Sequence, residues 1–142
     1  MRTPILALTA AAATVAIFAS FTTPKAQQPA PPITQGAANI KRIPLQKFDV
    51  PGTNFETVIA IAEIIPNVSI GRHSHPGIES AYVLEGDIIM KIDGQPDKAV
   101  KPGDSWQVPL GAIHDGVTGP KGARVIVTYV VEKGKPLATP AK

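Results

Sequence analysis

Short apolar runs, most of them closed by glycine or proline, follow one another along the chain from Ile40 onward. The first long run, Phe55–Pro66, is rich in Val and Ile, and the later runs are 5 to 11 residues long. No window combines the 3.6-residue apolar period of a helix with end caps. Many short strands interrupted by turn residues are typical of antiparallel sandwiches and barrels, so the pattern predicts an all-β fold.

The N-terminal stretch has a different pattern. Arg2 precedes an apolar run from Ile5 to Phe21, and small residues follow it. This is the arrangement of a secretory signal peptide, with a cleavage site after Ala26, so residues 1–26 are expected to be removed and the protein to be periplasmic or secreted. The alternative is an uncleaved membrane anchor, because a run of about 17 residues is at the lower edge of spanning length.

Three further segments complete the expected organisation. Residues 27–39 are rich in Pro, Gln and Ala, as in an extended linker. Residues 40–135 hold the strand pattern and form one domain, since the roughly 105 residues that remain after the N-terminal stretch suit a single core. Residues 136–142 are expected to be a flexible tail.

Charge and cysteine content narrow the functional classes. The net charge is +3, but removal of Arg2 and Lys25 with the leader leaves 12 Lys and Arg against 11 Asp and Glu. These charges are interspersed and form no basic stripe, which argues against nucleic acid as a partner. Because the chain has no cysteine, any metal ligands must come from His, Asp or Glu.

The stretch GRHSHPGIESAYVLEG, from Gly71 to Gly86, carries the candidate chemistry. His73 and His75 are two residues apart, so on a strand both imidazoles lie on one face. Glu79 begins the next extended segment, and the third histidine, His114, lies 35 residues further along. Three imidazoles and one carboxylate suit one divalent transition metal, such as Mn, Fe, Co, Ni, Cu or Zn, with coordination positions left for a substrate.

These residues resemble the two motifs of the cupin superfamily, in particular its small single-domain members. The first motif, G-x5-H-x-H-x(3,4)-E-x6-G, matches His73, His75, Glu79 and Gly86. The second, G-x5-P-x-G-x2-H-x3-N, matches Gly103, Pro109, Gly111 and His114. The resemblance covers residues 55–131, and 16 residues separate the two motifs.

Two positions depart from the motifs. Asn67 stands where the first motif has its leading Gly, and Thr118 stands where the second has its closing Asn. Neither position is a metal ligand in the family. Asn also tolerates the left-handed conformation that a leading Gly supplies, so we expect the turn to be kept.

The resemblance implies a jelly-roll β-barrel with the metal inside it on His73, His75, Glu79 and His114. Tyr82, Met90 and Trp106 are candidate substrate-binding residues, and the alternative is that they are barrel core. The run Ala123–Glu132 is apolar on both faces, as in a central strand or a strand covered by another subunit. Cupins are often dimers, so a homodimer is expected.

Three functional hypotheses follow from such a site. The first is an exported metalloenzyme that binds a small organic molecule and oxidises it with O₂, as a dioxygenase-like oxidoreductase, with Glu79 as the catalytic base. The second is a module that binds or senses a ligand or a metal without turnover. The third is a non-redox isomerase, lyase or hydrolase that uses the metal as a Lewis acid.

Overall fold

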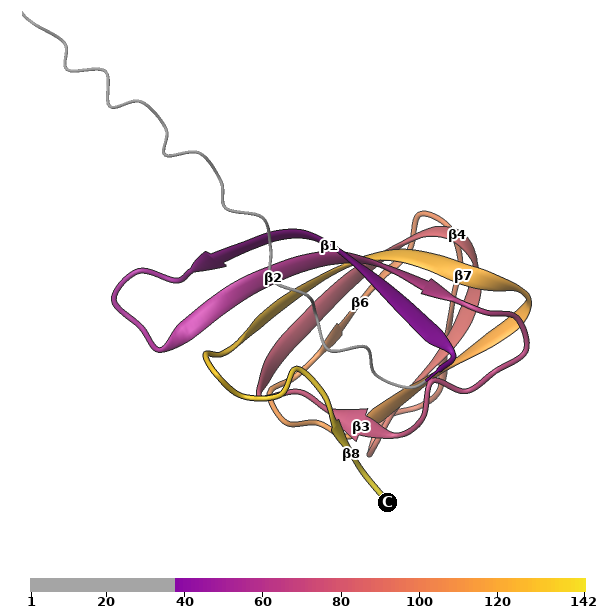
Figure 1. Cartoon of the computed structure of the whole chain (residues 1–142). Coiled ribbons are helices and arrows are strands. Elements are labelled where there is room, and N and C mark those ends of the chain that lie inside the picture. The colour runs from indigo at the N-terminus through magenta and orange to yellow at the C-terminus, as the bar shows by residue number, and fades with distance from the viewer. Residues whose placement is uncertain (1–37) are drawn as a thin grey trace, which may run out of the picture.

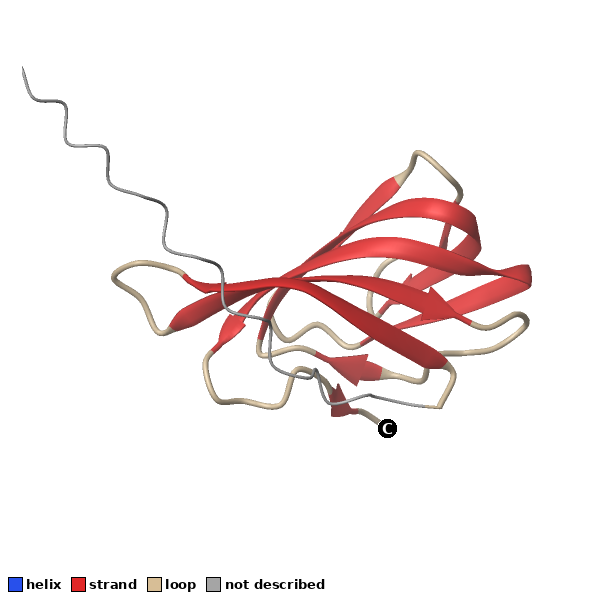
Figure 2. Ribbon diagram, turned by 45° about the horizontal axis from the view of Figure 1, so that its top comes forward, coloured by secondary structure: helices blue, strands red, loops and turns tan. Residues whose placement is uncertain are grey.

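The computed structural model describes residues 38–142, and within them every regular element is a strand. The expected all-β fold is therefore confirmed (Figure 2). The strands are β1 (Ile40–Asp49), β2 (Phe55–Ile64), β3 (His73–Ser74), β4 (Gly77–Ile92), β5 (Lys98–Val100), β6 (Ser105–Val108), β7 (His114–Glu132) and β8 (Thr139–Pro140). The expected leader and residues 27–37 of the expected linker lie outside the described residues, among which no helix is long and apolar enough to cross a membrane.

All strand pairings are antiparallel, and β7 lies at their centre. It pairs with β2, β3 and β4, while β1 adds to β2 and the short strands β5 and β6 add to β4. The sheet curls on itself (Figure 1), which gives the jelly-roll barrel expected for a cupin. Strand β7 is thus a central strand, and its residues from Ala123 to Glu132 alternate between buried and half-buried.

The longest strands, β4 and β7, pair twice. The first half of β4 faces the second half of β7, from Gly77 opposite Val131 to Gly86 opposite Ala123. The register then shifts, and Ile88–Ile92 faces the start of β7. Gly86 has a φ of 75° and lies so close to the Gly122 backbone that a Cβ would collide with it. Glycine at residue 86, the closing Gly of the first motif, is thus required where the strands bend.

The barrel interior follows from the two-residue period of the strands. Along the first half of β4, alternate residues from Gly77 to Val83 are buried, and the residues between them are half-buried or exposed. The largest fully buried side chains are aliphatic: Ile88, Val83, Val100, Val108 and Val127. Burying each such side chain contributes about 1.5–3 kcal/mol, so these residues supply the main stabilisation of the barrel.

The C-terminal residues, for which the sequence predicts a flexible tail, instead lie along the sheet. Strand β8 pairs with β3, with Thr139 opposite Ser74 and Pro140 opposite His73. The backbone N–H of Ala141 also donates to the carbonyl of Arg72. Because β8 is only two residues long and is held by backbone pairing, no side-chain pattern marks it in the sequence.

Candidate metal centre

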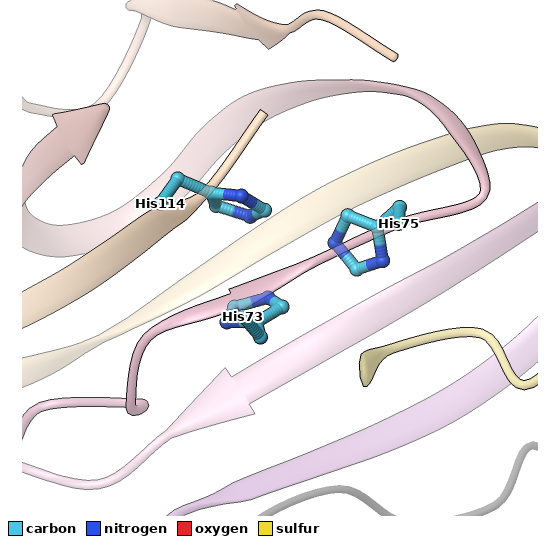
Figure 3. Close-up of side chains that lie close together, drawn as sticks. All are labelled: His73, His75 and His114. Atoms are coloured by element: carbon cyan, nitrogen blue, oxygen red, sulfur yellow. The ribbon is translucent and has the colours of Figure 1, made fainter. Parts of the chain in front are cut away.

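Three buried histidines converge inside one end of the barrel (Figure 3). His73 lies on β3, His75 follows directly after β3, and His114 begins β7, where it pairs with His73. One nitrogen from each ring lies within 4.8 Å of the others. The i, i+2 spacing of His73 and His75 thus puts both rings on the inner side, and the β3–β7 pairing adds the third.

Each ring is held by a backbone carbonyl behind it. The Nδ1 atoms of His73, His75 and His114 lie 2.7, 2.6 and 3.1 Å from the carbonyl oxygens of Gly71, Leu137 and Ala112. A carbonyl only accepts hydrogen bonds, so in the neutral ring Nδ1 carries the proton and Nε2 has a free lone pair. This is the arrangement that fixes tautomer and orientation in metal-ligating histidines.

Glu79 completes the cluster from β4. Its Oε2 atom lies 2.9 Å from the Nε2 of His75 and 3.8 Å from the Nε2 of His114. Its other oxygen, Oε1, accepts a 2.9 Å hydrogen bond from the indole Nε1 of Trp106. The carboxylate is thus aimed at the histidines by a buried donor on β6.

Burial and mutual contacts shift the pKa values of three residues in the cluster. Burial lowers the pKa of His73 to about 4. Burial alone would raise the pKa of the Glu79 carboxyl, but its contacts with the His114 and His75 rings outweigh burial and hold that pKa below its ordinary value. Burial also opposes protonation of His114, but the contact with Glu79 prevails and raises the pKa of that ring. Glu79 is therefore an ionised, acceptor-only group at neutral pH.

The donor set fits a divalent transition metal. The Nε2 atom of His75 is buried and makes no hydrogen bond within the described part of the chain. It is an acceptor 2.9 Å from a second acceptor, the Glu79 carboxylate. Two ligands about 2.1 Å from one ion and at right angles to each other would be about 3.0 Å apart, close to that separation. Imidazole nitrogen and carboxylate oxygen are ligands for Mn, Fe, Co, Ni, Cu and Zn.

A narrow cavity adjoins the cluster and is mainly apolar. Its polar lining comes from His73, His114, Glu79, Arg42 and Tyr129, and its apolar wall includes Met90, Trp106 and seven aliphatic residues of the barrel. Of the predicted substrate-binding residues, Met90 and Trp106 therefore line the cavity, and the indole also bonds Glu79. Both are buried residues of the barrel core as well.

The structure does not bring Tyr82 to this cavity. Its side chain is 48% exposed and lines a shallow groove on the outer face of β4 and β6. The reason is strand alternation: Glu79, Ala81 and Val83 point inward, so the residue between the last two points outward.

Three residues near the cluster were not among the predicted site residues. Tyr129 lies opposite Glu79 on β7, with its ring centroid 4.9 Å from that of His75. Arg42, on β1, reaches the same cavity and places its Nε 3.5 Å from the Tyr129 hydroxyl. Asp115 accepts hydrogen bonds from the Gly71 N–H and the Ser69 hydroxyl, which fixes the turn whose carbonyl orients His73. Tyr129 and Arg42 could have been found from the sequence as polar residues at inward positions of otherwise apolar strands.

The comparisons with known proteins agree with the fold. The Cupin domain family matches residues 60–132, just over half of the chain. The chain therefore belongs to the cupin family.

Three relatives indicate the range of the similarity. Dimethylsulfoniopropionate lyase DddW of Ruegeria pomeroyi is 36% identical over 69 residues, which are 49% of this chain and 45% of that protein. The structure of polyketide cyclase RemF from Streptomyces resistomycificus aligns with a TM-score of 0.57 and 29% identity over 75% of each chain. The structure of dimethylsulfoniopropionate lyase DddQ from Ruegeria pomeroyi aligns with a TM-score of 0.54 and 18% identity over 62% of this chain and 43% of that one. The chain thus spans less than half the length of either lyase.

Proposed function

We propose that the protein is an enzyme that holds one divalent transition metal on His73, His75, His114 and Glu79 and carries out a non-oxidative reaction on a small organic molecule. A lyase or isomerase step is the class we favour. The observation that carries the proposal is the convergence of three imidazoles and a carboxylate at one end of an apolar cavity, with every Nδ1 already used by a carbonyl.

The similarities support a non-oxidative reaction over the O₂-dependent oxidation expected from the sequence. The relatives described above are a lyase, a cyclase and a second lyase, and these names denote no net oxidation. When bound, the metal would supply Lewis-acid chemistry by polarising an oxygen atom of the substrate. Oxidation by O₂ stays a prediction that none of these observations tests.

The chain itself offers two groups for proton transfer, and they face each other across β4 and β7. Glu79 is ionised, and its Oε2, the oxygen not held by Trp106, would accept a proton when it is released from the metal. Burial raises the pKa of the Tyr129 phenol, so its hydroxyl is protonated at neutral pH and can donate. A carboxylate acceptor and a phenol donor on one wall are the pair that an elimination or isomerisation next to a polarised oxygen requires.

Turnover tested with and without O₂ separates the hypotheses. The untagged protein, loaded in turn with Zn, Fe, Mn, Ni, Co or Cu, is incubated with dimethylsulfoniopropionate and a panel of small carbonyl compounds and phenols. Substrate loss is followed by proton NMR. We expect loss without O₂, and none with the His114→Ala variant.

Two results would contradict the proposal. Turnover that requires O₂ would select the oxidation hypothesis. Stoichiometric binding of a panel compound without product would select the binding or sensing module.

Cellular location and assembly remain predictions. We propose that the enzyme works in the periplasm or outside the cell, on the basis of the leader at residues 1–26. We also propose a homodimer, as expected from the resemblance to cupins. Gel filtration at monomer size across micromolar concentrations would contradict the dimer.

A further inference from the structure

Arg42 is a buried cation without an anionic partner. Its residue is 6% exposed on the inner face of β1, and arginine is rarely buried to this extent unless it is paired. No carboxylate lies within 4.0 Å of its guanidinium in residues 38–142. Residues 1–37 contain no Asp or Glu that could supply one. Its one side-chain hydrogen bond in the described part of the chain is the contact with Tyr129.

Arg72, the second arginine near the site, does have an anionic partner. Arg72 donates two hydrogen bonds to the carboxylate of Asp93, at 2.9 and 2.7 Å, and a third to the carbonyl of Lys142. The neighbouring Lys41 likewise lies 3.4 Å from Glu63. These two exposed cations therefore have carboxylate partners, whereas the buried Arg42 has none within the described residues.

The position of Arg42 connects the metal centre with the surface. It lines the inner cavity together with His73, Glu79 and Tyr129. It also lines an adjoining outer pocket, together with His73, Arg72 and Pro140. A molecule that enters through the outer pocket and reaches the histidines therefore passes the guanidinium.

An unpaired guanidinium in an apolar wall is unfavourable, and an oxyanion from a ligand would satisfy it. The planar fork of arginine matches a carboxylate with two parallel hydrogen bonds. We propose that Arg42 binds the carboxylate of the substrate, so the enzyme acts on small carboxylic acids whose reacting carbon lies toward the histidines. This inference rests on the proposed function for the reaction, but the binding of a carboxylate at Arg42 can be tested without turnover.

The test compares an anion with its neutral analogue. Propionate and propanamide are titrated into the purified wild-type protein, as isolated with its metal, by calorimetry or NMR. A charged, bidentate hydrogen-bonding pair predicts that propionate binds about 10- to 100-fold tighter than propanamide. Arg42→Met should abolish this preference, Arg42→Lys should keep only part of it, and the matched control Lys41→Met, at the adjacent exposed position of β1, should keep it in full.

A preference for propionate that survives in Arg42→Met would overturn the proposal, because the metal or Arg72 would then be the anion site. Equal binding of both probes to the wild type would overturn it as well. Metal analysis of the same samples keeps the two claims apart: a wild type without metal contradicts the proposed function, while the propionate preference still reports on Arg42.

Thermal melting without ligand excludes a merely structural role. Removing an unpaired buried charge should leave the melting temperature of Arg42→Met equal to that of the wild type or higher. If Arg42→Met and Arg42→Lys both fail to fold, Arg42 is a structural residue and the proposal is wrong.

Discussion

Two pairs of facing residues on β4 and β7 differ in chemistry although the same strands position them. Glu79 faces Tyr129, and four positions further along β4, Val83 faces Val125. All four side chains point inward, and each is at most 5% exposed. One pair brings a carboxylate and a phenol to the histidines, whereas the other is plain aliphatic core.

The two pairs contribute differently: the valine pair contributes to stability, and the polar pair contributes to the site. The valine pair gains free energy simply by leaving water. The polar pair is buried at a cost, which the hydrogen bonds from Trp106 to Glu79 and from Arg42 to Tyr129 reduce. We therefore expect substitutions at the valine end to change stability and substitutions around the polar pair to change metal and ligand binding.

The largest effect should come from Val83→Ala at the apolar end. Deleting two buried carbons and leaving a small cavity should lower the free energy of unfolding by about 2–3 kcal/mol, with metal content unchanged. The control is Tyr82→Ala, the adjacent outward residue, which should cost less than about 1 kcal/mol. Urea unfolding measures both. A larger loss in Tyr82→Ala would show that the assignment of the two faces is reversed.

The next effect concerns the carbonyl behind His75. Ending the chain after Pro136 removes the Leu137 carbonyl that orients this ring, and should weaken metal binding about 10- to 100-fold. Leu137→Ala keeps the carbonyl, so its metal affinity should stay within a few-fold of the wild type. Competition with a chromophoric chelator measures both affinities. Equal affinity in the truncated and full-length proteins would mean that the C-terminal residues have no part in the site.

Acid should lower the stability of the metal-free protein through the titrating groups of the histidine cluster, whereas the valine pair does not titrate. The pKa of His73 is lowered from 6.5 to about 4, so the unfolded chain takes up its proton first. Stability of the metal-free protein should therefore fall as pH drops from about 6.5 to about 4. The pKa of Glu79 is also lowered, and its contribution is lost at still lower pH. His114, with a raised pKa, acts in the opposite direction, since its contribution is lost as pH rises through that value.

Urea midpoints of chelated protein between pH 7 and pH 4 measure this dependence. His73→Gln should flatten the slope, and Val83→Ala should lower all midpoints without changing it. The metal-loaded protein should lose its metal over the same range, because protons compete for the imidazoles. Metal content that is unchanged at pH 4 would contradict ligation by three histidines.

The smallest effect is expected at Asn67, where the chain departs from the first cupin motif. Asn67 has a φ of 56°, in the left-handed region that favours Gly and tolerates Asn. Asn67→Ala should cost about 1 kcal/mol, and Asn67→Gly should stay within about 0.5 kcal/mol of the wild type. Thermal melting resolves the two variants. Equal stability of the Ala variant would show that the backbone there relaxes.

The strands and part of the histidine cluster were predictable because their determinants are local. Alternation and glycine placement give strands and turns, and the two-residue spacing of His73 and His75 puts both rings on one face. That His114 joins them was implied by the resemblance to the cupin motifs. The left-handed turn at Asn67 was also expected. Its N–H bonds the carbonyl of Gly119, and the hydroxyl of Thr118 bonds the carbonyl of Ile65, so both departures from the motifs lie at one contact.

The rest of the site depends on contacts that the sequence does not display. Arg42 lies two residues after the inward-facing Ile40, so it points inward too. The inward–outward alternation that would reveal this is interrupted further along β1, where the register shifts between Pro44 and Gln46. Tyr129 meets Glu79 because the first half of β4 pairs with the second half of β7, and the sequence does not display that register. By contrast, alternation from Glu79 was enough to place Tyr82 outside, and this signal was overlooked.

Metal content tests the central claim most directly. The untagged wild-type protein and the His75→Ala and His114→Ala variants are purified, checked for folding and measured by elemental analysis. We predict about one equivalent of a divalent transition metal per wild-type chain and none in either variant. A folded wild type that holds no metal and takes up none on reconstitution would contradict the account, as would equal metal content in the three proteins.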